Sequence, residues 1–159
     1  MAAYQLAFCV FMLMASLFFE FVVKLTPCAL CLVQRFLVVA LIITAFATLI
    51  RLLQKKSALA YRVISILVAG LGLLVAWRHI WLQQNASLAL DAICLPDISY
   101  MLKVMSLPQV AFKIFSQAGA ECSKIKWSFL GYSMPFWVGF MYMSYIGSQL
   151  ISVYIERKN

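Results

Sequence analysis

The sequence predicts an all-α membrane protein, a bundle of four transmembrane helices with a long outer loop that carries short amphipathic helices. Two features of its composition support this class. Of the 159 residues, 65% are hydrophobic and 11% are charged, against about 45–50% and about 25% in soluble domains. So short a chain cannot bury that much apolar surface by itself. A soluble enzyme and a disordered chain are therefore excluded, and we expect lipid to cover the apolar exterior.

Four apolar runs along the chain are long enough to cross a bilayer as helices. About 20 residues span the hydrocarbon core, and a helix satisfies its own backbone hydrogen bonds in lipid. The second run is interrupted by Gln34 and Arg35, and the third contains Arg78 and His79 near its end. Within a single integral membrane domain, 1–159, we expect spans at about 5–24, 29–50, 63–82 and 134–155.

The basic residues predict how these spans are oriented. The net charge is +8, and Lys and Arg gather in the 51–62 connection and in the tail at 157–158. By the positive-inside rule, both chain termini then face the cytoplasm. The first span stays attached, because it lacks the basic leader and the small-residue cleavage site of a signal peptide. Since the charge sets topology, we expect no nucleic-acid partner.

The predicted outer loop, 83–133, has Trp81 and Trp127 at its two edges, where they would act as interfacial anchors. Polar residues recur between 99 and 116 at intervals of three or four, which is the period of an amphipathic helix. Pro108 must break or begin a helix there, so we expect two short helices. They lie either on the membrane surface or against the top of the bundle.

Four of the five cysteines fall on the predicted outer side of the membrane. Cys28 and Cys31 stand at the start of the second span, whereas Cys94 and Cys122 lie in the outer loop. The outer face of a bacterial-type membrane is oxidising, so thiol–disulfide chemistry is expected there. Cys9 stands alone in the first span, and we interpret it as a small buried core residue.

Residues Cys28-Ala-Leu-Cys31 form a CxxC motif directly after Pro27. Since proline favours the start of a helix, we expect both cysteines in the first turn of the second span. The unpaired N–H groups and the positive dipole end at that position favour a thiolate. Arg35 follows on the same helical face. A charge inside a span is costly, so we interpret Arg35 as a partner of a thiolate or of a cofactor oxygen. The alternative is that its side chain extends to the outer headgroups.

Cys94 and Cys122 lie far apart within the outer loop. One interpretation is a structural disulfide that closes this loop. Zinc is disfavoured, because His79 is the only histidine and the two loop cysteines are not a closely spaced ligand pair. We therefore expect no metal.

Ionisable residues at similar depths predict a polar pocket just below the outer surface. They are Glu20, Arg35 and Arg78, with His79 beside the last. Leu, Phe and Trp residues would wall this pocket, and a planar lipid-soluble cofactor would fit it. The alternative for Arg78 and His79 is interfacial anchoring.

Two motifs carry a resemblance to a known family. Residues 27–35, P-C-A-L-C-L-V-Q-R, resemble the P-C-x-L-C-x-x-x-R signature of the disulfide bond formation protein B family. Residues 127–137, W-S-F-L-G-Y-S-M-P-F-W, resemble that family's W-x-F-L-G-x-x-M-P-x-W segment, which opens the last helix. The four-span layout and the two outer cysteine pairs agree as well, so the resemblance covers nearly the whole chain.

The resemblance implies a quinone-dependent thiol oxidase of the bacterial inner membrane. Cys28 and Cys31 match the redox pair that exchanges electrons with ubiquinone or menaquinone. Cys31 would face the quinone as a thiolate, and Arg35 matches the arginine that supports it. Arg78 and His79 are further candidates for quinone binding.

The resemblance also implies a role for the loop cysteines. Cys94 and Cys122 match the redox pair that oxidises a soluble periplasmic partner, a thioredoxin-fold dithiol oxidase. Cys94 would form the mixed disulfide with this partner, and Cys122 would pass electrons toward Cys28. A mobile loop suits this task, because thiol–disulfide exchange needs access to both reaction partners.

Two other functions are considered. A vitamin-K-epoxide-reductase-like enzyme also joins a CxxC pair to a quinone in a four-helix bundle. Its loop pair lies between the first two spans, whereas Cys94 and Cys122 lie between spans three and four. The other alternative is a non-enzymatic membrane scaffold with two structural disulfides. It does not explain why a charged residue, Arg35, lies inside a span.

Overall fold

Among the residues that the structure describes, four long helices are each long and apolar enough to cross a membrane. The computed structural model describes residues 2–25, 27–85, 100, 103–106, 108–109, 122–123 and 127–158, the side chains of 156 and 157 excepted. The helices are α1 (Ala2–Phe21), α2 (Ala29–Leu53), α3 (Leu59–Gln84) and α7 (Met134–Lys158). The chain is therefore an all-α, four-helix membrane protein, which confirms the predicted fold class.

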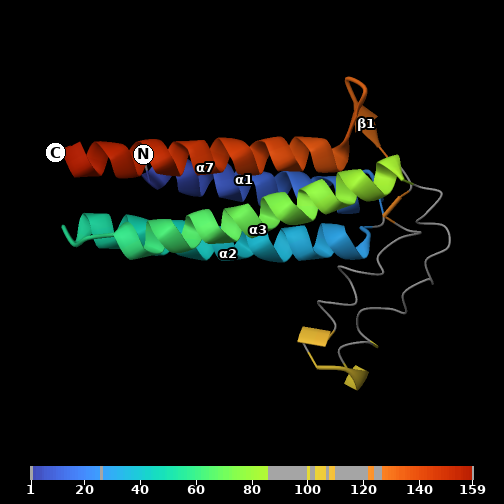
Figure 1. The fold of residues 1–159 in the computed structure, drawn as a ribbon, viewed down its shortest axis with the longest axis horizontal. Coiled ribbons are helices and arrows are strands. Elements are labelled where there is room, and N and C mark those ends of the chain that lie inside the picture. Colours follow the sequence, from blue (N-terminus) through green and yellow to red (C-terminus); the bar gives the residue numbers. More distant parts are fainter. Residues whose placement is uncertain are drawn as a thin grey trace.

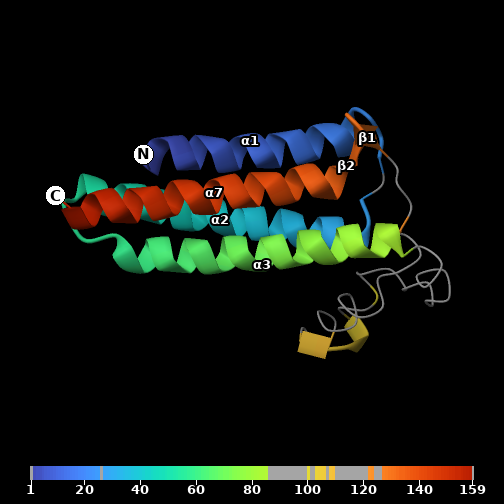
Figure 2. The ribbon, with the colours of Figure 1, turned by 45° about the horizontal axis from the view of Figure 1, so that its top comes forward.

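The helices run side by side along the long axis of the molecule (Figures 1 and 2). Both chain termini and the connection between α2 and α3 lie at one end, which we call the termini end. The connection from α1 to α2 lies at the other end with the start of α7, and we call this the cysteine end because Cys28 and Cys31 lie there. α2 packs on α1 and α3, and α3 packs on α7, whereas α1 and α7 touch little.

The link between α1 and α2 shows why the first helix ends before the apolar run does. The N–H groups of Val22 and Val23 both donate to the carbonyl of Phe18, at 2.9 and 3.3 Å. Lys24 then takes a positive φ of 56°, a conformation that no helix continues through. The chain turns there, and α1 ends at Phe21. The hydropathy had predicted an end near residue 24.

α2 begins at Ala29, where the predicted second span begins, but Cys28 lies just before the helix. Cys28 was expected in the first helical turn together with Cys31. It has extended backbone angles instead and is the residue before the helix, and its carbonyl accepts the Leu32 N–H at 3.1 Å. The Cys28 side chain therefore lies at the rim of the helix end, and Cys31 lies within the first turn.

A short hairpin precedes α7. Strands β1 (Ser128–Phe129) and β2 (Tyr132–Ser133) pair antiparallel. The two residues between them, Leu130 and Gly131, both have positive φ angles, 52° and 82°, which two-residue hairpin turns require. The helix consequently starts only at Met134, where the predicted fourth span also starts.

The middle of the bundle is held together around Tyr142. This side chain is fully buried with Cys9, Leu41 and other apolar residues, and its hydroxyl donates to the carbonyl of Gln34 at 3.0 Å. The tyrosine ring lies where a Cβ on Gly72 would stand. A glycine at this position therefore lets α3 approach α7, and the hydroxyl bond ties α7 to α2 one residue before Arg35.

Several predictions for the outer loop lie outside the described residues. Cys94 is among them, as is most of the 99–116 segment in which two amphipathic helices are expected. Cys122 and Ser123 are described, and both are buried.

Candidate functional site

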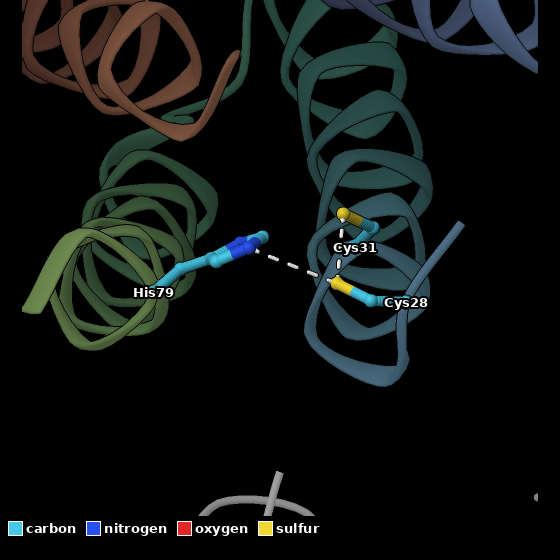
Figure 3. Close-up of side chains that lie close together, drawn as sticks. All are labelled: Cys28, Cys31 and His79. Atoms are coloured by element: carbon cyan, nitrogen blue, oxygen red, sulfur yellow. Dashed lines mark hydrogen bonds between the residues drawn. The ribbon is translucent and has the colours of Figure 1, made fainter. Parts of the chain in front are cut away.

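The CxxC pair and the only histidine of the chain meet at the cysteine end. The Cys28 thiol donates to the Cys31 sulfur at 3.1 Å, and the Nε2 atom of His79 lies 3.8 Å from the Cys28 sulfur. Figure 3 shows the imidazole reaching across from α3 toward the two sulfurs at the head of α2. Cys28 is 7% exposed and His79 only 3%. The fold thus brings His79, 51 positions along the chain, to the redox motif.

The loop cysteine Cys122 also reaches this site. It is 1% exposed and shares a buried cluster with Cys28 and Leu30. The pKa of the Cys28 thiol is raised to about 12, foremost by a hydrogen bond with Cys122 and also by burial, while the hydrogen bond with Cys31 works against this. Cys122 and burial therefore favour the protonated form of Cys28. Cys31 lies within the first turn of α2, at the positive end of the helix dipole.

Arg35 is held by two residues of α1. Its Nε and Nη2 atoms donate to the Ser16 hydroxyl at 3.2 and 3.1 Å, and its Nη1 atom pairs with the Glu20 carboxylate. The Arg35 and Glu20 side chains are 20% and 27% exposed. Since Ser16 and Glu20 are one helical turn apart, they hold the guanidinium along one face of α1.

Two cavities open beside these residues. The smaller, about 80 Å³, is lined by Cys28, Cys31, Arg35, His79 and Glu20, among others. The larger, about 260 Å³, lies between α1, α2 and α7. Ser16, Cys31, Gln34 and Arg35 are its polar or reactive lining residues, and the others are apolar, among them Met12, Leu13, Val38, Trp127, Trp137 and Met141. Of the CxxC-to-arginine motif, Cys31, Gln34 and Arg35 line the larger cavity, whereas Cys28 lines only the smaller one.

Trp127 covers both cavities, a position that its prediction as an interfacial anchor did not anticipate. Its ring centroid lies 4.9 Å from that of Phe19 and 6.0 Å from that of Phe129. It lines the smaller and the larger cavity alike. Trp127, which directly precedes the hairpin, therefore contributes an aromatic wall to both cavities.

Arg78 lies apart from the other ionisable residues of the predicted pocket. Its guanidinium stands over the ring of Trp81, 4.5 Å from the centroid, and neither cavity is lined by it. This arrangement favours the interfacial-anchor interpretation of Arg78. Glu20, Arg35 and His79, by contrast, share the lining of the smaller cavity.

Sequence reasoning did not single out Ser16. Ser16 had a detectable signal, because it is a polar residue one turn before Glu20 in a largely apolar span. The resemblance implied that Cys122 passes electrons toward Cys28, and the structure places these two cysteines in one buried cluster.

A bundle of membrane-spanning helices with a dithiol at the head of one of them defines a membrane thiol–disulfide protein. Comparison with known proteins specifies it further. Residues 1–151 match the family described as disulfide bond formation protein DsbB. Among curated relatives, disulfide bond formation protein B of Methylococcus capsulatus is 35% identical over 131 residues, which cover 82% of this chain and 79% of the relative.

Two further relatives carry the same name. The protein of Chromohalobacter salexigens is 33% identical over 159 residues, which cover 96% of this chain and 90% of the relative. That of Acinetobacter baumannii is 36% identical over 126 residues, covering 77% and 71%. The chain belongs to the disulfide bond formation protein DsbB family, and it is a membrane disulfide-generating oxidoreductase.

Proposed function

We propose that this protein is a thiol oxidase that reoxidises a periplasmic thioredoxin-fold dithiol oxidase and passes the electrons to a membrane quinone. The observation that carries the proposal is the shared lining of the larger cavity, where Cys31 and Arg35 face a largely apolar space between helices that can span a membrane. A reactive sulfur and a cationic donor at the edge of an apolar cavity are what a planar, lipid-soluble electron acceptor requires.

The shape and lining of the cavity support ubiquinone or menaquinone as the acceptor. A bound quinone supplies a two-electron, two-proton sink. Arg35 can donate to a ring oxygen, while Trp127, Trp137 and Met141 can contact the ring faces. The loose seam between α1 and α7 leaves room for an isoprenoid tail to reach the lipid. Ser16 and Glu20 keep the guanidinium oriented before the quinone binds.

The order of the sulfurs supports a relay with two redox pairs, Cys94–Cys122 and Cys28–Cys31. A partner thiolate would attack the loop disulfide at Cys94, which releases Cys122 as a thiolate. Cys122 would then attack the Cys28–Cys31 disulfide at Cys28, which forms the Cys28–Cys122 bond and releases Cys31 as a thiolate beside the larger cavity. The contact between Cys122 and Cys28 and the placement of Cys31 favour this direction.

The proposal includes a location in the bacterial inner membrane, with the cysteine end facing the periplasm. Arg51, Lys55, Lys56 and Arg62 lie at or near the α2–α3 connection. This is the termini end of the bundle. The positive-inside rule then keeps the termini end in the cytoplasm, and the periplasm supplies the oxidising conditions that the cysteines need. The whole chain acts as one membrane domain in this proposal.

The test is quinone reduction by the purified, detergent-solubilised protein supplied with a reduced thioredoxin-fold dithiol protein. Quinone absorbance is followed with a short-chain ubiquinone and with a short-chain menaquinone. We expect turnover with at least one of them and its loss in Cys31→Ser. Cys9→Ala is the matched control, because Cys9 is a buried cysteine that lines neither cavity. If quinone is not reduced, or if Cys31→Ser reduces it as fast as the unchanged protein, the proposal is wrong.

A further inference from the structure

Three ligand atoms of the kinds that zinc prefers converge at the head of α2. The sulfurs of Cys28 and Cys31 and a ring nitrogen of His79 all lie within 4.8 Å of one another, and Figure 3 shows the imidazole directed at the sulfur pair. We propose that the reduced protein binds a thiophilic divalent cation of the zinc class at Cys28, Cys31 and His79. This departs from the expectation of no metal, which rested on the single histidine and on the wide spacing of Cys94 and Cys122.

The distances fit a tetrahedral site after a small adjustment. Zinc–sulfur and zinc–nitrogen bonds of about 2.3 and 2.0–2.1 Å set tetrahedral ligand separations of about 3.8 Å between sulfurs and about 3.6 Å between sulfur and nitrogen. The Cys28 sulfur stands 3.8 Å from His79 Nε2 and 3.1 Å from the Cys31 sulfur. The two sulfurs must move apart by rotation of side chains at a helix end, and the Cys31 sulfur already lies within 4.8 Å of a His79 ring nitrogen.

The surroundings leave one coordination position open. The three ligands line the cavity of about 80 Å³, together with Pro27 and Gln83, and a space of that size holds water. Three protein ligands with a water in the fourth position are a known zinc arrangement. A neutral imidazole with its proton on Nδ1 presents its Nε2 lone pair to the ion, and the α2 N-terminus favours the two thiolates.

Cation binding at this place depends on the redox state of the pair. Two thiols and one divalent cation give the complex and release two protons, and no electron moves. The Cys28–Cys31 disulfide offers no thiolate, so only the reduced pair binds. Because both sulfurs are then occupied, the cation holds the pair reduced and blocks electron transfer. Only this inhibitory consequence rests on the proposed function; the binding site itself does not.

The test uses cobalt as a spectroscopic substitute for zinc on the full chain in detergent, without quinone and without oxygen. We expect the reduced protein to develop the visible bands of tetrahedral cobalt and a near-ultraviolet sulfur-to-cobalt band, and we expect zinc to abolish both. His79→Gln should weaken zinc binding by about tenfold or more, since losing even an outer partner of a metal ligand costs that much. Cys31→Ser removes one of the two sulfur ligands and should lower the sulfur band by about half or more, and Cys9→Ala should change nothing.

The results that would overturn the site are equally direct. Unchanged zinc affinity in His79→Gln, or the same cobalt spectrum in the oxidised protein, contradicts it. Circular dichroism and a thermal melt report whether His79→Gln folds, and Cys31→Ser provides the second variant. Quinone reduction is measured separately with a chelator present. Cobalt binding without quinone reduction overturns only the proposed function, and quinone reduction without cobalt binding overturns only the metal site.

Discussion

The two ends of the bundle both bury polar side chains, but they arrange them differently. At the termini end, Arg62 donates to Gln149 at 3.3 Å, and Gln149 donates to the Tyr145 hydroxyl at 2.8 Å. Gln5 of α1 donates to Ser152 of α7 at 3.3 Å. These groups join helices to one another, and neither of the two cavities beside the CxxC pair extends to them.

At the cysteine end, the polar groups face a space instead. Cys31 and Arg35 line the larger cavity, and His79 lines the smaller one. Arg62 is nevertheless more deeply buried than Arg35. A buried arginine in a membrane helix is therefore not by itself a sign of function, although it is costly. What distinguishes Arg35 is that it is held in place at the wall of an apolar cavity.

Among the variants that test the difference between the two ends of the bundle, Arg35→Gln should have the largest effect, a rise in the quinone KM. The variant loses a charge-assisted hydrogen bond to the quinone, worth about 1.5–3 kcal/mol, so the quinone KM should rise about tenfold to a hundredfold. Thiol exchange between the loop pair and its protein partner, measured without quinone, should be unchanged. Steady-state kinetics with varied quinone provide the check.

Arg51→Gln is the matched control for Arg35→Gln, because Arg51 stands on the same helix near the termini end, over the ring of Tyr61. Its quinone KM should stay within about twofold of the unchanged protein, less than 0.5 kcal/mol. An equal rise in both variants would mean that net charge, and not the position of Arg35 at the cavity, governs quinone use.

Gln149→Leu tests the role of the termini end, and we expect it to lower the stability of the protein. Gln149 is fully buried, and its loss takes away an acceptor of Arg62 and the donor to Tyr145. We expect a loss of about 1–3 kcal/mol in unfolding free energy, because two hydrogen bonds of buried polar groups are removed. Denaturation in detergent measures it, and quinone turnover per folded molecule should not change.

Gln149→Glu is the companion variant, since its carboxylate still accepts from Arg62. It should recover most of the lost stability. A Gln149→Leu protein that keeps its stability, or one whose folded fraction reduces quinone several-fold more slowly, would contradict the assignment of a structural role to the termini end.

Hydropathy predicts which segments of this chain form membrane-spanning helices, but it predicts their ends less accurately. The apolar runs predicted the four helices, and the CxxC motif predicted where α2 begins, because both are local properties of the sequence. Helix ends were less accurate. α3 starts at Leu59 instead of residue 63, since Tyr61 and Arg62 continue the helix beyond the most apolar stretch.

The rotation of each helix about its axis was not predictable. His79 faces Cys28 because α3 turns that side inward, and α3 approaches α7 where Gly72 meets the ring of Tyr142. No periodicity reveals which residues meet across helices that are all strongly apolar. For the same reason, the hydrogen bonds from Arg35 to Ser16 could not be foreseen from the spacing of residues on α2 alone.

Glu20→Gln gives the smallest effect and tests how Arg35 is held. The Glu20–Arg35 pair is partly exposed, and such pairs contribute about 0.2–1 kcal/mol, so the quinone KM should rise by up to about fivefold. Losing the negative charge beside the guanidinium should also speed alkylation of Cys31 at fixed pH, because Arg35 then stabilises the Cys31 thiolate more strongly. Quinone kinetics and mass-spectrometric alkylation rates measure the two effects.

Ser16→Ala separates orientation from charge in this arrangement. It removes the hydroxyl that accepts from two nitrogens of Arg35 but leaves the Glu20 charge in place. The quinone KM should therefore rise as in Glu20→Gln, while the alkylation rate of Cys31 stays constant. If both variants leave the KM unchanged, the cavity alone positions Arg35, and the contacts with α1 only join two helices, as Gln5 and Ser152 do at the termini end.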